Sequence, residues 1–182
     1  MSRATVEAAQ GAGEARGASG PAATSGRYLT LHLRDETYAL PVEDVTEILE
    51  YRRPTPVPMM PPTVRGVIDR RGRAVPVIDT AVRFGGQATE TGRRAAIVIL
   101  ERGHRAVGML VDAVGAVVHL DGRDIEPPPE HVLTGKADVV AGMALVGDGF
   151  IVIVSTTALL SLDDGTAAGG AGRDTEGWRT VP

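Results

Sequence analysis

A run of residues from Val64 to Phe84 constrains the fold more than any other part of the sequence. Val64 to Ile68 and Ala74 to Ile78 are short apolar segments rich in β-branched residues, which favour strands. Between them, Asp69 to Gly72 have the polarity and the glycine of a hairpin loop. The sequence therefore predicts two paired strands joined by a charged tip.

The end of this hairpin predicts a capped helical turn. Asp79 follows the second strand, and its carboxylate can accept hydrogen bonds from the next free backbone amides. Thr80 to Phe84 can form one helical turn, which Gly85 and Gly86 end. The acid is thus predicted to cap the turn.

Arginines gather at the tip of the predicted hairpin, where Arg70, Arg71 and Arg73 lie at or beside the turn and Arg65 precedes them. Such a cluster is compatible with a solvated hairpin end. It also fits a docking site for a carboxylate-bearing partner, because arginine offers a rigid fork of donors suited to bidentate pairing.

The rest of the ordered chain predicts many short strands. Leu29, Leu31 and Leu33 alternate with polar residues, which is the period of a half-buried strand. Glycines within apolar runs, at Gly66, Gly108 and Gly142, predict bulges, sharp bends or close approach of another strand. Further strands are predicted at residues 38–40, 95–100, 106–111, 114–120, 139–146 and 150–154, and a final helical turn at 156–160 after the cap Ser155.

A short helix is predicted after Pro41. Val42, Val45 and Leu49 recur at i, i+3 and i+7 and would form a buried stripe. Glu47 would then point away from the strands. Prolines at five of the nine positions 54–62 predict a stiff connection, because proline cannot donate to a strand ladder.

The strands and turns together predict a mainly β fold of two adjacent small barrels with a few short helices. We expect residues 27–162 to form this unit, with a first barrel at about 27–86 plus a C-terminal segment and a second at about 94–154. Residues 1–26 and 163–182 are small and polar, so we expect disordered tails. Only 3% of residues are aromatic, so valine, isoleucine, leucine and alanine must fill the core.

Composition and motifs argue against several classes of function. The net charge of −4 and the scarcity of aromatic residues argue against nucleic-acid binding. The chain has no cysteine, and its four histidines show no ligand spacing, so we expect no cofactor and no metal. Asp79 and Asp112 follow strands and suit caps better than a catalytic acid and base. We expect a cytoplasmic protein that is neither an enzyme nor inserted in a membrane.

Several short motifs follow one another between about Tyr28 and Leu160. They are Tyr38-Ala39-Leu40-Pro41-Val42, Val45-Thr46-Glu47-Ile48, Val64-Arg65-Gly66-Val67-Ile68, Arg71-Gly72, Val75-Pro76-Val77-Ile78-Asp79, Val107-Gly108-Met109-Leu110-Val111-Asp112 and Ile125-Glu126-Pro127. No single motif is decisive, but in this order they resemble the CheW-like coupling proteins of bacterial chemotaxis. Two departures occur: Asp69-Arg70 replaces the family's Asn-Leu, and Thr80-Ala81 replaces Leu-Arg.

The resemblance implies two SH3-like five-stranded barrels and a non-catalytic adaptor. Its partners would be the signalling tip of methyl-accepting chemoreceptors and the regulatory domain of a CheA-type histidine kinase, at chemoreceptor arrays. The alternative is a small β-barrel protein that binds a ligand or nucleic acid. The family's partner contacts fall on Val45, Glu47 and Ile48 of the predicted helix, on Arg65, Gly66 and Arg71, and on Val107 and Met109.

Overall fold

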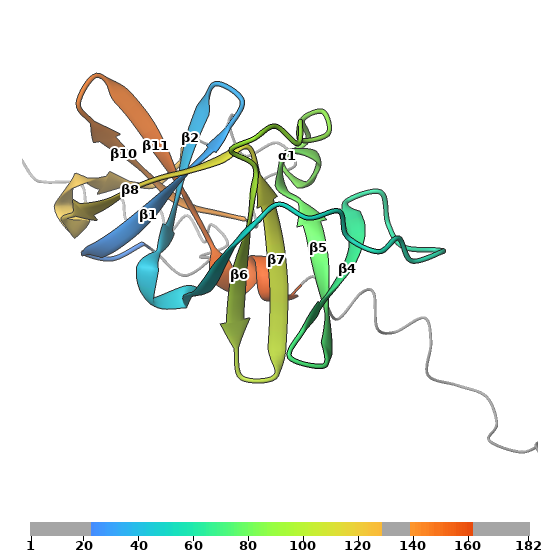
Figure 1. The fold of residues 1–182 in the computed structure, drawn as a ribbon. Helices are drawn as coiled ribbons and strands as arrows, with labels where there is room; N and C mark the ends of the chain where they lie inside the picture. Colours follow the sequence, from blue (N-terminus) through green and yellow to red (C-terminus); the bar gives the residue numbers. More distant parts are fainter. Residues whose placement is uncertain (1–22, 129–138, 162–182) are drawn as a thin grey trace, which may run out of the picture.

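The computed structural model describes residues 23–128 and 139–161, which form two β-sheets with short helical turns (Figure 1). The predicted disordered tails lie outside these residues, apart from 23–26. In chain order the elements are β1 (Gly26–Leu33), β2 (Glu36–Pro41), the 3₁₀ turn η1 (Val42–Asp44), β3 (Val45–Glu50), β4 (Val64–Arg70), β5 (Arg73–Asp79), α1 (Thr80–Arg83), β6 (Ala96–Arg102), β7 (Arg105–Val111), β8 (Ala113–Leu120), the 3₁₀ turn η2 (Gly122–Asp124), β9 (Ile125–Glu126), β10 (Val140–Val146), β11 (Gly149–Val154) and α2 (Thr156–Ser161).

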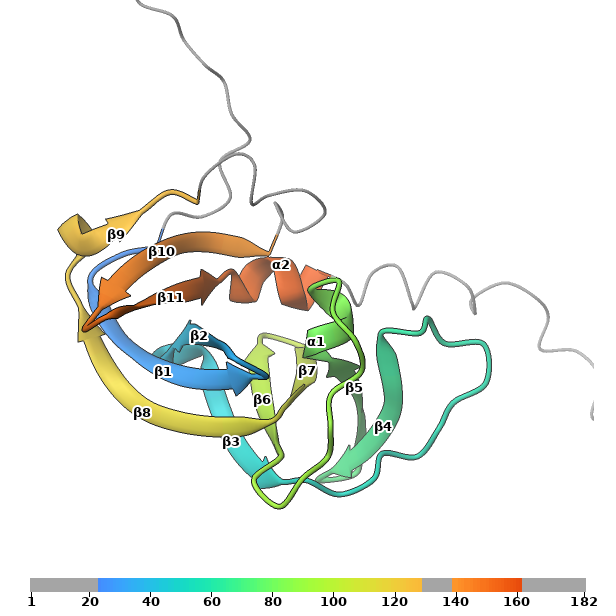
Figure 2. The same ribbon diagram turned by 90° about the horizontal axis from the view of Figure 1, so that it is seen from above.

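One sheet has six strands in the order β8-β1-β2-β11-β10-β9, and the other has five in the order β3-β6-β7-β5-β4. Neighbouring strands are antiparallel except for β2 with β11 and β5 with β7. The predicted fold class, mainly β with two β units, is confirmed, although neither sheet closes into a continuous barrel. Figures 1 and 2 both show β6 and β7 between the outer strands of the two sheets.

The strands are divided between the two sheets differently from the division expected for the first and second barrels. β3, β4 and β5 lie in the same sheet as β6 and β7, whereas β8 returns to pair with β1. The expected division assumed that strands close in sequence lie in one unit. The register of Leu29 with Val117 is a long-range pairing, and hydrophobic alternation carries no sign of which distant strand will be the neighbour.

The apolar residues form three clusters. One fills the five-stranded sheet and contains Ile97, Ile99 and Leu110. A smaller one fills the six-stranded sheet and contains Tyr28 and Ile153. The largest joins the two sheets, and its fully or nearly fully buried members include Leu31, Leu40, Val98, Leu100, Val107, Met109, Val111 and Leu159. β6 and β7 thus contribute alternate residues to two different clusters, because both their faces are covered.

The hairpin predicted between Val64 and Phe84 is confirmed, but its loop is the two residues Arg71 and Gly72 rather than the four expected from Asp69 to Gly72. β4 pairs with β5 from Val64 opposite Ile78 to Arg70 opposite Arg73. Arg71 and Gly72 form the turn with φ of 53° and 78°, as a two-residue turn of the I′ type requires. Asp79 caps α1 by accepting a hydrogen bond from the amide of Val82. Ser155 likewise accepts from the amide of Ala158 at the start of α2.

The predicted helix after Pro41 is wrong beyond its first turn. Only η1, Val42–Asp44, is helical, and Val45–Glu50 is strand β3. β3 pairs with β6, so that Ile48 lies opposite Val98. The spacing of Val42, Val45 and Leu49 fitted a helix by coincidence, because Val45 packs on the cluster between the sheets and Leu49 on the cluster inside the five-stranded sheet. Pairing with a buried central strand overrides the helical periodicity.

The glycine predictions are confirmed in two forms. The strand registers shift at Gly66 in β4 and at Gly142 in β10, as bulges do. Gly108 in β7 keeps its register but allows close packing, because a Cβ there would lie 2.8 Å from Cγ2 of Ile97. Gly66 is the most constrained, since its φ is 138° and a Cβ would lie 2.2 Å from the carbonyl oxygen of Thr55.

Candidate functional site

β3 and β4 are the two edge strands of the five-stranded sheet and stand at opposite ends of its strand order. After β3 the proline-rich connection crosses to β4, where Thr55 and Val67 exchange two backbone hydrogen bonds of 2.8 Å each. Further along β4, Nε of Arg70 lies 2.9 Å from a carboxylate oxygen of Glu47 on β3. A single bridge and an ion pair therefore bring the edges together without a continuous ladder.

Arg70 also joins the sheet edge to the β6–β7 turn. Its Nη1 donates to Glu101 at 2.7 Å, and only 12% of its side chain is exposed. Arg73 donates to the other oxygen of Glu101 at 3.1 Å and to the carbonyl of His104 at 2.8 Å. The hydrogen bonds that Arg70 donates to Glu47 and then to Glu101 raise the pKa of Arg70, and the bond that Glu101 accepts from Arg70 is the main cause of the lowered pKa of Glu101. Both charges are therefore stabilised in the folded chain.

Arg71 differs from its two neighbours at the tip. It is exposed, lies in the left-handed region of the turn, and enters no ion pair with the described part of the chain. Arg70 and Arg73 are held by carboxylates within the protein. Of the three arginines predicted at the tip, Arg71 is therefore the one whose guanidinium faces solvent for an outside partner.

Arg65 lies near the opposite end of β4 and makes hydrogen bonds within the protein. Its Nε donates to Asp79 at 2.8 Å and its Nη2 to the carbonyl of Thr89 at 3.1 Å. Asp79 is fully buried and also accepts from the amide and the hydroxyl of Thr89. Arg65 and Asp79 together fasten the α1–β6 loop to the hairpin, while 36% of the Arg65 side chain stays exposed.

The other predicted contact residues fall into two groups. Ile48 is 47% exposed on the outer face of β3, and Glu47 beside it is partly exposed. Val107 and Met109, by contrast, are 3% and 0% exposed and belong to the cluster between the sheets. Both were expected to contact a partner, but their burial makes them core residues. β7 is covered on both faces, so its alternating side chains are all taken up by packing.

The structure therefore divides the predicted site. The ion pair between Arg70 and Glu47 joins β4 to β3, and the next residues in the chain, Arg71 and Ile48, are both exposed. Along β4, Arg65 and Gly66 lie about 17 and about 13 Å from Arg70, given the rise of a strand. Sequence reasoning missed Glu101, although its place in the predicted β6–β7 turn, opposite a hairpin rich in arginine, was a usable signal.

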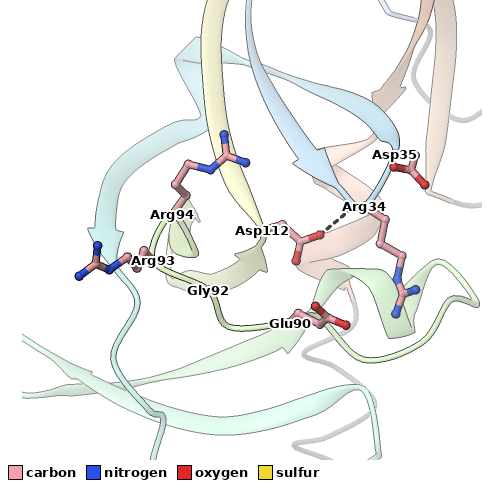
Figure 3. Close-up of a pocket in the computed structure, with 7 residues that line it drawn as sticks. All are labelled: Arg34, Asp35, Glu90, Gly92, Arg93, Arg94 and Asp112. Atoms are coloured by element: carbon pink, nitrogen blue, oxygen red, sulfur yellow. Dashed lines mark hydrogen bonds between the residues drawn. The ribbon is translucent and has the colours of Figure 1, made fainter.

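A separate cleft of about 470 Å³ lies where the β1–β2 turn, the α1–β6 loop and the β7–β8 junction meet (Figure 3). The backbone amide of Arg34 donates to the Asp112 carboxylate at 2.6 Å, so Asp112 holds the β1–β2 turn. Figure 3 shows that the guanidinium groups of Arg34, Arg93 and Arg94 point in different directions. They do not converge on one point as an anion site would require.

The described residues hold no group of three or more histidine, cysteine or acidic side chains placed to bind a metal ion. Nor do residues 23–128 and 139–161 contain a helix long and apolar enough to cross a bilayer. His131, one of the four histidines of the sequence, lies outside these residues.

The described residues form a two-sheet β domain with a charged hairpin tip, and comparison with known proteins gives its family. A family model described as a CheW-like domain matches residues 27–164. The chain belongs to the CheW-like family.

Named relatives agree with this assignment. The chemotaxis protein CheW of Klebsiella aerogenes is 31% identical over 137 residues, covering 75% of this chain and 82% of that protein. The CheW of Rhizobium meliloti is 29% identical over 140 residues, covering 77% and 90%. The crystal structure of scaffolding protein TtCheW from Thermoanaerobacter tengcongensis matches with a TM-score of 0.66 and 34% identity, covering 72% of this chain and 89% of that one.

Proposed function

We propose that this chain is a non-catalytic adaptor that couples methyl-accepting chemoreceptors to a CheA-type histidine kinase. It would act in the cytoplasm, at chemoreceptor arrays, by binding the signalling tip of the receptor and the regulatory domain of the kinase. Membership of the CheW-like family supports this role, as do the names of its relatives, which are chemotaxis proteins and a scaffolding protein.

One arrangement in the chain carries the proposal. The ion pair between Glu47 and Arg70 supports it, because the next residues in the chain, Ile48 and Arg71, are both exposed and would be available to one partner. An apolar contact flanked by a charge is what an amphipathic helix with an acidic residue on its rim would recognise. Arg71 would fix the register of such a helix, and Ile48 would supply buried area.

The remaining predicted contacts have other parts in the proposal. Arg65 keeps enough exposed surface to touch a partner, but its hydrogen bonds to Asp79 and Thr89 make it first a positioning residue. Gly66 would act through the bulge that it permits in β4. Val45, which is partly buried, and the fully packed Val107 and Met109 would support the surface from within.

Reconstitution tests the proposal as a whole. Purified chain is added to receptor-containing membranes and the CheA-type kinase of the same cell, and kinase autophosphorylation and co-sedimentation are measured. We expect both to rise several-fold with the chain present. A chain that binds neither receptor membranes nor kinase would overturn the adaptor role, and retention on DNA at moderate salt would favour the nucleic-acid alternative.

A further inference from the structure

Four exposed arginines gather where β3 ends and β6 begins, two on each segment. They are Arg52, Arg53, Arg93 and Arg94, and together they are called the arginine patch. The amide of Tyr51, just before the first pair, donates to the carbonyl of Ala95, just after the second pair, at 3.1 Å. This hydrogen bond extends the antiparallel pairing of β3 with β6, and it holds the two pairs of arginines side by side.

The arginine patch is compact enough for one segment of a ligand to span it. Opposite residues of an antiparallel pair have Cα atoms about 5.5 Å apart, and consecutive Cα atoms are about 3.8 Å apart, so those of Arg52 and Arg94 lie within about 13 Å of each other. Arg93 and Arg94 occupy the centre of a turn in which the amide of Ala95 donates to the carbonyl of Gly92 at 3.0 Å. The backbone therefore fixes where these side chains start.

The chain provides no carboxylate for the arginine patch within residues 23–128 and 139–161, where none of its four side chains enters an ion pair or a hydrogen bond. Other arginines are paired with acids, as Arg70 is with Glu47 and Arg102 with Asp44. The whole chain has a net charge of −4, so the cluster does not come from a generally basic surface. Four like charges held close together repel one another, and an anionic partner would relieve that repulsion.

We propose that the arginine patch binds a carboxylate-rich segment of a partner protein. The planar fork of arginine pairs with carboxylates through two parallel hydrogen bonds, and two segments that each carry two forks can engage several carboxylates along one extended stretch. Exposed acids flank the patch, at Glu50 on β3 and at Glu90 before the turn. These acids and the net negative charge of the chain would repel a longer polyanion, such as duplex DNA or an anionic bilayer, around the patch.

The arginine patch is separate from the surface proposed at the hairpin tip. β6 begins at Ala96, beside the patch, and reaches Glu101, which accepts from Arg70 at the tip. Five residues of a strand span about 17 Å, so the patch and Arg71 lie toward opposite ends of the five-stranded sheet. The protein thus presents two cationic surfaces that different partners would be able to occupy at once. This inference does not depend on the adaptor role.

The test uses two short labelled peptides, one alternating glutamate with serine and one alternating glutamine with serine, and measures their binding by fluorescence anisotropy at low salt. We expect the glutamate peptide to bind the full chain at least about tenfold more tightly than the glutamine peptide. In NMR spectra, the glutamate peptide should shift the Nε–Hε signals of the arginine patch and leave that of Arg27 in place. The Arg52→Glu/Arg94→Glu variant should bind this peptide about tenfold or more weakly than wild type, with an unchanged denaturation midpoint.

A matched control is the Arg27→Glu/Arg123→Glu variant, which changes the net charge by the same amount at exposed arginines of the other sheet and should bind the glutamate peptide as wild type does. Equal losses in the two variants would mean a general charge effect and would overturn the proposal. So would shifts confined to arginines outside the patch. If the patch holds short duplex DNA or phosphatidylglycerol vesicles more tightly than the glutamate peptide, its partner is a nucleic acid or a membrane and the proposal is wrong. Self-association that the Arg52→Glu/Arg94→Glu variant abolishes would assign the patch to a second copy of the chain, which also contradicts it.

Discussion

The guanidinium of Arg70 and the carboxylate of Glu47 lie 2.9 Å apart although their strands, β4 and β3, stand at opposite edges of the five-stranded sheet. The pair is reinforced by Glu101, which accepts a second hydrogen bond from Arg70. β3 and β4 are not paired with each other, and the only backbone bridge to β4 from this side among the described residues comes from Thr55 in the connection, so the ion pair links the two edge strands through side chains.

Replacement of Glu101 by glutamine should lower the stability of the fold at neutral pH and should make that stability depend less on pH in the acidic range. Arg70 lowers the pKa of Glu101 below its ordinary 4.5, so the interaction is fully present above the unfolded pKa and is lost as pH falls through the folded pKa. Thermal midpoints measured from neutral to acidic pH should show a gap between wild type and Glu101→Gln that is constant above about pH 5 and narrows below it. A gap that widens in acid would contradict this ion pair.

Gly66→Ala should destabilise the fold by about 2–4 kcal/mol, because it combines a positive φ with a clash against the carbonyl of Thr55. Gly103→Ala is the matched control, since Gly103 also has a positive φ but has open space around it. We expect the control to cost about 1 kcal/mol. Urea denaturation of the two variants decides the question, and equal losses would mean that the close approach of Thr55 is unimportant.

Asp79→Ala should cost about 3 kcal/mol of stability, since it leaves Arg65 and Thr89 without their buried acceptor. Hydrogen exchange should become faster at the amides of Thr89 and Val82, which now donate to this carboxylate. Asp121→Ala, a change at an exposed carboxylate, serves as the comparison and should fall within about 0.5 kcal/mol of wild type. Unchanged exchange at Thr89 would show that the carboxylate does not hold the loop.

Met109→Ala should destabilise the protein by about 2–5 kcal/mol, as expected for truncation of a fully buried side chain. Binding to receptor or kinase, measured at a low temperature where both proteins stay folded, should be nearly unchanged. A large loss of affinity with normal stability would instead restore Met109 as a contact residue.

Arg71→Glu should leave the denaturation midpoint within about 0.5 kcal/mol of wild type, because the side chain is exposed. It should weaken binding to kinase or receptor about tenfold or more through reversal of charge. The control is Arg123→Glu, which reverses an exposed arginine on η2, next to the other sheet. If Arg71→Glu and Arg123→Glu bind both partners as tightly as wild type, the surface assigned to the tip is wrong.

Local features were predictable from the sequence because they depend on neighbours in the chain. The pairing of the strands on either side of Gly72, the cap at Asp79 and the bulge glycine Gly66 follow from turn chemistry and backbone sterics, and all were confirmed, although the turn is two residues shorter than predicted. The strand at Val45–Glu50 was mistaken for a helix because its apolar spacing fits both periods. Only its pairing with β6 decides between them.

The candidate site was less predictable, because it depends on contacts between distant residues. Nothing near Glu47 in sequence indicates that Arg70 will reach it across the sheet edges. Likewise, Val107 and Met109 read as ordinary strand residues. That both faces of β7 are covered becomes visible only when two sheets are assembled around it.

The position of β6 and β7 between two apolar clusters has a consequence for how the protein can be divided. Each half of the molecule uses the same pair of strands as one wall, so a cut in the loop between α1 and β6 would leave neither fragment with a complete interior. The two fragments should be insoluble or unfolded apart and should regain structure only when mixed. Insertions and deletions in this family should therefore accumulate in the outer turns. In β6 and β7, a substitution that changes side-chain volume should be accompanied by an opposite change in a neighbouring side chain.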